Sequence, residues 1–244
     1  MFISPIDQLR SERKEVKFYS TDIWNEHKKR DNMVAEMKSG PESRIVDIVG
    51  LHGYETYLAK CLVGPPSKGY VKRIQYLKKA VPKGFHKKLL ILNKEVVGQI
   101  EYSPPEASYY PITGESLVVM NCIWVLRKAK GHGFGKQLLK NMIDSEKDAS
   151  GFATIALENH WSPWFRKDQI EKLGFKVVDS IRVTHRIKHK TEVFNICLMW
   201  MPNLKNAKIP IWNKLQLLEG ITSCIAHPLY HPRTYEPKRI LEKH

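Results

Sequence analysis

The sequence has few cysteines, and no two of them are close together. Cys61, Cys122, Cys197 and Cys224 are far apart, so the chain lacks the Cys-x-x-Cys pairs of zinc ribbons and thioredoxin-like sites. Cys122 and Cys197 lie in apolar runs, where cysteine behaves as a small buried residue. This usage is typical of a reducing compartment. We therefore expect no metal site and a cytoplasmic protein.

Long apolar segments are also missing. The longest apolar run, residues 117–126, is too short to cross a bilayer. The chain begins Met1-Phe2-Ile3-Ser4-Pro5 and turns polar at once, which excludes the apolar core of a signal peptide. We expect no membrane partner.

Acidic residues are scarce relative to basic ones. Asp and Glu number 25 against 40 Lys and Arg, a formal net charge of +15. Such a charge attracts nucleic acid, anionic lipid or a polyanionic cofactor. The basic residues are scattered, however, and the chain has no arginine-rich tail, no recognised nucleic-acid motif and no repeats of alternating basic and aromatic residues. We therefore do not expect a nucleic-acid partner.

Helical and strand patterns alternate along the chain. We expect strands at residues 45–49, 89–92, 96–102, 117–126, 152–157, 177–183 and 194–200. Helices are expected at residues 54–62, 71–81, 136–147 and from about Asn159 to Lys172. Helices interleaved with strands in one core indicate a mixed α/β sheet.

Two extensions flank this core. Residues 1–43 are expected to form a helical N-terminal extension, with its helix between about Ser20 and Met37. Residues 44–201 are expected to form the main domain. The proline-containing residues 202–244, with a helical pattern at 215–219, are expected to pack on the domain as a tail.

A glycine-rich loop carries the clearest chemical signal. Lys130-Gly131-His132-Gly133-Phe134-Gly135-Lys136 follows a strand and opens a helix. Glycine lets the backbone approach a ligand closely, and the N–H groups at a helix start attract anions. We therefore expect this loop to bind a pyrophosphate.

Three phosphate-binding motifs compete for this loop. A P-loop would need glycine at Lys130 and a hydroxyl residue at Gln137, so that motif fails. A Rossmann fingerprint would need glycine at Lys136, although Glu158 does end the next strand, where a ribose-binding acid could sit. The third motif is an acyl-coenzyme A site.

The third reading rests on a family resemblance. Lys130-x-x-Gly133-x-Gly135 resembles the Gln/Arg-x-x-Gly-x-Gly/Ala signature of the GNAT superfamily, with lysine as a conservative departure. Asn159 and Leu173-Gly174-Phe175 stand at the family's next two landmarks, and the likeness covers roughly residues 45–201. It implies an α/β fold, with a mixed, mostly antiparallel central sheet flanked by helices.

The resemblance also implies a function and a set of site residues. The expected activity is acetyl transfer from acetyl-CoA to a primary amine of a small molecule or protein, by direct attack. Backbone groups near Val125 would bind the pantetheine arm, one N–H facing the oxyanion. The implied cofactor-binding residues are Cys122, Ile123, Trp124, Val125, Lys130, Gly131, His132, Gly133, Phe134, Gly135, Lys136 and Asn159. Homodimers, which many members form, are implied as well.

The catalytic positions depart from the family's pattern. Ile170 stands where many members have a tyrosine acid, and Val119 where some have a glutamate base. Glu158 and His160, flanking Asn159, are the nearest candidates for proton transfer, with Glu101 and Glu115 further away. Trp161, Trp164 and Phe165 would crowd the next helix start, lining an acceptor pocket or packing in the core.

Three functions are compatible with the sequence. An N-acetyltransferase explains the glycine loop in its strand–helix setting. A non-catalytic acyl-CoA sensor would explain Ile170 and Val119. A basic nucleic-acid-binding protein would explain only the charge. That charge weighs against cationic acceptors unless Glu101, Glu106 and Glu115 make the pocket acidic.

Overall fold

The computed structural model describes residues 42–61, 70–186, 189–224, 226–229 and 240–244. The chain divides into two compact units, Met1–Glu42 and Ser43–His244, and every element below belongs to the second. The helix expected between Ser20 and Met37 lies outside the described residues.

The described elements alternate between helix and strand. In chain order they are β1 (Ser43–Asp47), α3 (Glu55–Ala59), α4 (Tyr70–Ala80), β2 (His86–Leu92), β3 (Glu95–Ser103), β4 (Ile112–Thr113), β5 (Leu117–Val125), α5 (Phe134–Ser145), β6 (Gly151–Glu158), α6 (Lys167–Glu171), β7 (Lys176–His185), β8 (Val193–Pro202), β9 (Ile211–Trp212), α7 (Lys214–Leu217) and β10 (Leu241–Lys243). The fold is mixed α/β.

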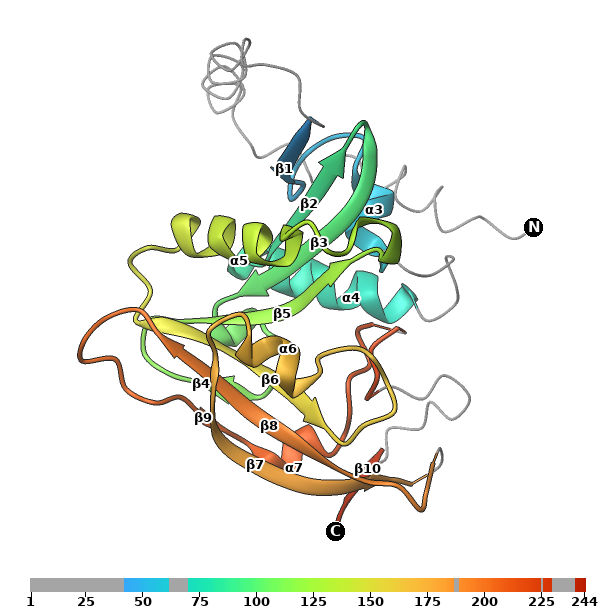
Figure 1. The fold of residues 1–244 in the computed structure, drawn as a ribbon, viewed down its shortest axis with the longest axis vertical. Helices are drawn as coiled ribbons and strands as arrows, with labels where there is room; N and C mark the ends of the chain where they lie inside the picture. Colours follow the sequence, from blue (N-terminus) through green and yellow to red (C-terminus); the bar gives the residue numbers. More distant parts are fainter. Residues whose placement is uncertain (1–41, 62–69, 187–188, 225, 230–239) are drawn as a thin grey trace. The chain divides into compact units, whose positions relative to one another are not determined.

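Eight strands form one sheet in the order β1-β2-β3-β5-β6-β8-β7-β10, and β4 pairs with β9 apart from it (Figure 1). Among the described strand pairs, only β5 and β6 run parallel. The sheet is therefore mostly antiparallel, as the family resemblance implied. The hairpin between β2 and β3 turns at Asn93 and Lys94, whose φ angles of 49° and 67° suit a tight two-residue turn.

Helices cover both faces of the sheet. Consecutive residues of a strand point to opposite faces. On β2, the Lys88 ammonium bonds Asn141 and Ser145 of α5, whereas Lys87 pairs with Glu101, which also binds Arg73 of α4. We call these two sides of the sheet the α5 face and the α4 face.

A bulge interrupts β5 at Asn121. Glu101 of β3 pairs with Cys122 and Tyr102 with Met120, so Asn121 has no partner on β3. Its carbonyl instead accepts hydrogen bonds from Tyr109 (2.6 Å) and Tyr110 (3.0 Å). Its side chain donates to Ser103 and accepts from Ser108. This buried polar residue is fully bonded within an otherwise apolar strand.

The helix expected directly after Asn159 begins later and is shorter. Asn159 and Phe165 have φ angles of 60° and 53°, which are incompatible with a continuing right-handed helix. The backbone N–H of Leu157 donates to the Phe165 carbonyl, at 2.6 Å, and closes the intervening loop. α6 therefore starts only at Lys167. Trp161, Trp164 and Phe165 belong to this loop and not to a helix start.

The tail adds strands and core residues to the main unit. β9 pairs with β4, and β10 pairs with β7 at one edge of the large sheet. Leu217, Leu229 and Leu241 are buried in the same apolar cluster as β5 and β6. Residues after 202 thus complete the hydrophobic core.

Candidate functional site

Strands β5 and β6 separate partway along their length. Their pairing is confined to Leu117–Val119 against Gly151–Ala153. Beyond this, Met120 and residues 122–125 pair with β3, and residues 154–158 pair with β8. The Thr154 hydroxyl donates to the Met120 carbonyl, at 2.7 Å, where the strands part. We call the two diverging segments the strand fork. Because its inner edges lack a partner strand, their backbone groups can bind an extended ligand.

The glycine loop, residues 130–136, leads from the open end of β5 into α5. Gly131 and Gly133 have φ angles of 89° and 72°, a region that favours glycine. A Cβ on Gly131, Gly133 or Gly135 would meet no atom within 4 Å, so the space beside the loop is open. Among described hydrogen bonds, none is donated by the backbone N–H of Gly131 or His132. Open space and available N–H groups at a helix start fit a phosphate group.

Three lysines surround this loop in different settings. Lys128 forms an ion pair with Glu95. The Lys130 ammonium lies 5.2 Å from the centroid of the Trp124 ring, within cation–π range. Lys136, in the first turn of α5, is exposed. Of the three, only Lys128 is in an ion pair within the described part of the chain.

Residues 54–163 match the family model described as Acetyltransferase (GNAT) family. This chain contains a GNAT acetyltransferase domain. The matched residues include the strand fork, the glycine loop and Asn159. No curated protein sequence matches the chain.

Solved structures of GNAT proteins resemble the domain at low sequence identity. A GNAT-family acetyltransferase from Desulfovibrio desulfuricans has a TM-score of 0.48 and 11% identity, covering 67% of this chain and 100% of its own. A GNAT acetyltransferase from Elizabethkingia anophelis, with acetyl-CoA bound, has a TM-score of 0.43 and 21% identity. This match covers 66% of the present chain and 97% of the Elizabethkingia protein. The ribosomal-protein-S18-alanine N-acetyltransferase from Escherichia coli has a TM-score of 0.45 and 13% identity. This match covers 69% of the present chain and 100% of the Escherichia coli protein.

Aromatic side chains bridge the fork of the GNAT domain on its α4 face. Trp124 pairs with Gln99, two residues from Glu101, so its side chain lies on the α4 face. Its ring stacks on that of Trp164, with centroids 4.4 Å apart. The sequence placed Trp124 among the cofactor-binding residues and Trp164 near an acceptor pocket. The structure brings the two side chains into contact.

Glu158 and His160, the two candidates for proton transfer, lie on opposite faces of the sheet. Glu158 accepts hydrogen bonds from Lys167 of α6 and from Asn195 of β8, each at 2.7 Å. The His160 ring packs against Phe194, the neighbour of Asn195 on β8, with centroids 4.6 Å apart. Since adjacent strand residues point to opposite faces, the two candidates do not share one site.

Hydrogen bonds define what each candidate can do. Those from Lys167 and Asn195 hold the pKa of Glu158 below its usual value, which makes its carboxylate a weak base. His160 accepts the backbone N–H of Ser162 at Nδ1, 3.0 Å away, so the neutral ring carries its proton on Nε2. His160 can therefore take up a proton only when the Ser162 turn opens.

The two positions that depart from the family pattern are apolar and buried. Ile170 in α6 and Val119 in β5 belong to the main core, with 2% and 0% of their surface exposed. Neither side chain can transfer a proton. Position 170 thus contributes packing between α6 and the sheet.

Two of the three glutamates that could have made an acceptor pocket acidic, Glu101 and Glu115, are paired with cations. Glu101 is buried and pairs with Arg73 (2.7 Å) and Lys87 (2.9 Å). Burial raises its pKa, but these two cations outweigh that effect and hold the pKa below its usual value. Glu115 pairs with Lys208 on the surface. The Glu101 cluster, one anion against two cations, is net positive.

A buried histidine that the sequence did not single out lies beside the fork. His227, from the tail, has Nε2 2.8 Å from the Tyr110 hydroxyl, which donates to the bulge carbonyl of Asn121. A separation of 117 positions leaves no local signal for this contact. The polar Asn121 inside an apolar run was the only sequence hint of a polar cluster here.

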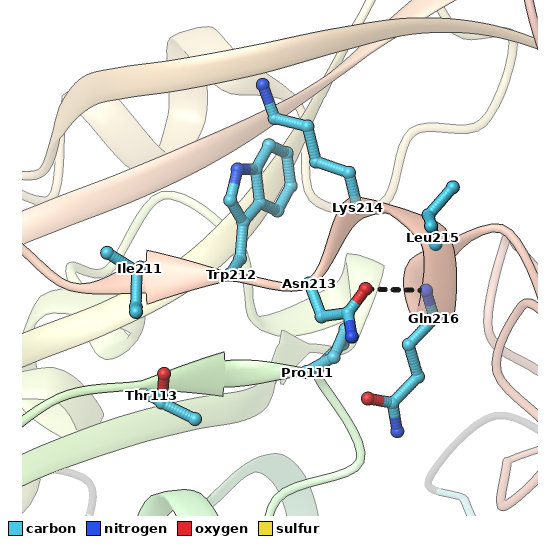
Figure 2. Close-up of a pocket in the computed structure, with 8 residues that line it drawn as sticks. All are labelled: Pro111, Thr113, Ile211, Trp212, Asn213, Lys214, Leu215 and Gln216. Atoms are coloured by element: carbon cyan, nitrogen blue, oxygen red, sulfur yellow. Dashed lines mark hydrogen bonds between the residues drawn. The ribbon is translucent and has the colours of Figure 1, made fainter.

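A separate hollow of about 660 Å³ lies between β4, β9 and the start of α7 (Figure 2). Ile211 and Leu215 line it and are largely exposed. Its charged residue, Lys214, is paired with Asp179. Asn213 caps α7 by accepting the Gln216 N–H, as Figure 2 shows. We assign no chemistry to this hollow.

The described residues contain neither a cluster of metal-ligating side chains nor a membrane-spanning helix. No group of three or more histidine, cysteine or acidic side chains is arranged to hold a metal ion. No described helix is long and apolar enough to span a membrane.

Proposed function

We propose that this chain is an N-acetyltransferase that moves the acetyl group of acetyl-CoA to a primary amine of a small molecule or protein. The strand fork beside the glycine loop carries the proposal. One end of this arrangement suits a pyrophosphate and the other an extended arm.

The residues of the chain divide the work of binding. Backbone N–H groups of residues 131–136 hold the pyrophosphate, and Lys130 and Lys136 offset its charge. Backbone groups of residues 122–125 align the arm along β5, and Asn159, exposed at the end of β6, contacts it from the other strand. When bound, acetyl-CoA supplies a thioester whose carbonyl an amine can attack.

The state of the cysteines favours direct transfer over an acyl-cysteine intermediate. Burial raises the pKa of Cys122 far above its usual value and that of Cys197 to about 11. A hydrogen bond with Cys61, together with burial, also raises the pKa of Cys224. Such thiols stay protonated at neutral pH and are poor nucleophiles. The protein therefore accelerates transfer mainly by positioning amine and thioester together.

Between the two candidates for proton transfer, we favour His160. It lies on the α4 face with Trp161 and Phe194, whereas Glu158 is held by an ion pair to α6 on the other face. The glycine loop leads into α5, which covers the opposite face, so we place the approach of the amine on the α4 face. Release of the Ser162 N–H would let Nδ1 accept the amine proton.

A non-catalytic acyl-CoA sensor is the second candidate. The observation that favours it is the buried, apolar character of Ile170 and Val119, which removes both of the family's usual proton-transfer groups. A coenzyme A thiol has a pKa of roughly 8.5, as a free cysteine does, so it can leave without an acid. The apolar residues therefore do not prevent catalysis.

A thiol-release assay separates the two candidates. Acetyl-CoA is incubated with the protein and a panel of small amines and peptide N-termini, and free coenzyme A is measured with a thiol reagent. Amine-dependent release with saturation kinetics supports the transferase. Binding of acetyl-CoA without release for any amine supports the sensor.

A further inference from the structure

A hollow of about 300 Å³ lies between α4 and the tail, on the α4 face of the sheet. Polar groups line much of it, from Lys72, Gln75, Tyr76, Tyr109, Thr222 and Ser223. A volume near 300 Å³ is at the small end of ligand pockets. It matches a small metabolite better than a polypeptide.

The hollow lies next to the strand fork. Tyr109 lines it, and the hydroxyl of the same residue donates to the Asn121 carbonyl at the bulge of β5, 2.6 Å away. One side chain thus connects the hollow to the point where β5 and β6 have separated. The hollow therefore lies one tyrosine side chain away from the bulge of β5.

The charge around the hollow is positive. Lys72 lines it, and none of the lining residues in the described part of the chain is acidic. Behind its wall, the Cζ atom of Arg73 lies 5.5 Å from the centroid of the Tyr76 ring. Arg73 and Lys87 together share the single carboxylate of Glu101, which leaves one uncompensated positive charge in a buried setting.

Two buried donors nearby lack partners within the described part of the chain. They are Nη1 of Arg73 and the hydroxyl of Ser223, which itself lines the hollow. An unbonded buried donor costs about 1–3 kcal/mol, more when it is charged. These two unpaired donors, next to the net positive Arg73–Glu101–Lys87 cluster, are suited to bind an anionic oxygen group.

We infer that this hollow binds a carboxylate carried by the acceptor, so that the acceptor is a small amino acid. The inference rests on the proposed function. Lys72 and Ser223 bind the carboxylate directly. The positive charge of Arg73, which lies behind Tyr76, attracts it electrostatically. The amine end then extends past Tyr109 toward the fork. Cationic acceptors such as diamines are rejected by the same charges.

Matched acceptors test the inference. We would compare kcat/KM for 4-aminobutyrate, butylamine and 1,4-diaminobutane, which share a chain length and differ at the far end. The expected preference for 4-aminobutyrate over butylamine is about tenfold or more, as one charge-assisted hydrogen bond provides. Equal values, or a preference for the diamine, would overturn the inference. Faster turnover of phosphoethanolamine than of 4-aminobutyrate would overturn the carboxylate assignment.

Variants locate the effect in the hollow. Lys72→Met and Ser223→Ala should each raise KM for 4-aminobutyrate, about tenfold for the lysine, and leave KM for butylamine unchanged. Lys79→Met removes the same charge from an exposed position on α4 and should change neither value. If Lys79→Met raises KM for 4-aminobutyrate relative to butylamine as much as Lys72→Met does, the assignment is contradicted.

A binding experiment distinguishes failure of the inference from failure of the proposed function. Calorimetric titration of 4-aminobutyrate into the full chain with coenzyme A needs no turnover. Suppose that 4-aminobutyrate binds, that Lys72→Met and Ser223→Ala weaken this binding, and that no amine is acetylated. This result would contradict the proposed transferase function and support the carboxylate site. Acetylation of amines without preference, and no such binding, would keep the transferase and remove the site.

Discussion

Nε2 of His227 lies 2.8 Å from the hydroxyl of Tyr110 and ties the tail to the bulge in β5. The Leu229 N–H donates to Nδ1 of the same ring, 3.1 Å away, so the neutral imidazole donates from Nε2. The Tyr110 hydroxyl in turn donates a hydrogen bond to the Asn121 carbonyl. Burial, with a smaller contribution from the charge of His160, lowers the pKa of His227 to about 3. The ring is therefore neutral at physiological pH.

This histidine makes folding stability depend on pH. The unfolded chain binds a proton at His227 near pH 6.5, whereas the folded chain does so only near pH 3. Unfolding thus takes up a proton between these values, and the free energy of unfolding falls as pH drops below 6.5. At pH 5 the loss from this group is about 2 kcal/mol, at roughly 1.4 kcal/mol per pH unit. Urea unfolding at pH 5 and pH 7 measures it.

The variant His227→Gln provides the control for that slope. It should be less stable than the wild type at pH 7, by about 1–3 kcal/mol, because the hydrogen bonds to Tyr110 and Leu229 are disturbed. The difference between the two proteins should shrink at pH 5. A difference that stays constant from pH 7 to pH 5 would show that His227 does not titrate as described.

The buried Glu101 is expected to matter far more than an exposed glutamate. Glu101→Gln leaves Arg73 and Lys87 buried without an anion and should cost about 3–5 kcal/mol of stability. Glu95→Gln removes a glutamate that pairs with Lys128 at the surface, for about 0–1 kcal/mol. Chemical denaturation of both variants at pH 7 compares them. Equal losses would mean that the Arg73–Glu101–Lys87 cluster is not desolvated.

The assignment of proton transfer predicts unequal effects at two neighbouring positions. His160→Gln should lower kcat by about a hundredfold or more, the usual contribution of a general base. Glu158→Gln keeps an acceptor for Asn195 and loses only a partly exposed ion pair, so kcat should change by less than about threefold. Steady-state kinetics across pH test both. A larger loss for Glu158→Gln would reverse the roles.

The glycine loop should show a binding effect beyond its backbone strain. Gly133 and Gly50 have φ angles of 72° and 79°, and a Cβ on either would meet open space. Alanine at each should therefore cost a similar amount, about 1 kcal/mol or more. Only Gly133→Ala should also weaken acetyl-CoA binding. If Gly50→Ala weakens it as much, the effect comes from general destabilisation.

Local patterns predicted the parts of the fold that depend on nearby residues. The hairpin at Asn93-Lys94, the glycine loop before α5 and the glycine stop at Gly174, with a φ of 103°, all follow from turn and helix-end chemistry. The family motif then placed the fork and Asn159 relative to one another.

Contacts between distant segments could not be predicted in the same way. The Tyr110–His227 bond and the Glu101 cluster join residues from separate elements, and no periodicity encodes such pairs. The loop after Asn159 was missed because its apolar residues resemble a helix start, while two left-handed residues redirect the backbone. Glu158 and His160 lie on opposite faces because they contact Asn195 and Phe194, which are adjacent residues of β8. Their closeness in the sequence gives no indication of this.

Calorimetric titration of acetyl-CoA into the wild type and Gly135→Ala tests the central claim most directly. Gly135 has no left-handed backbone, so alanine in this helix should stabilise the free protein by about 0.5–1 kcal/mol. The added Cβ nevertheless fills the open space beside the loop. We predict saturable binding to the wild type and at least about tenfold weaker binding to the stabilised variant. No binding to the wild type, or equal binding to both proteins, would contradict the account.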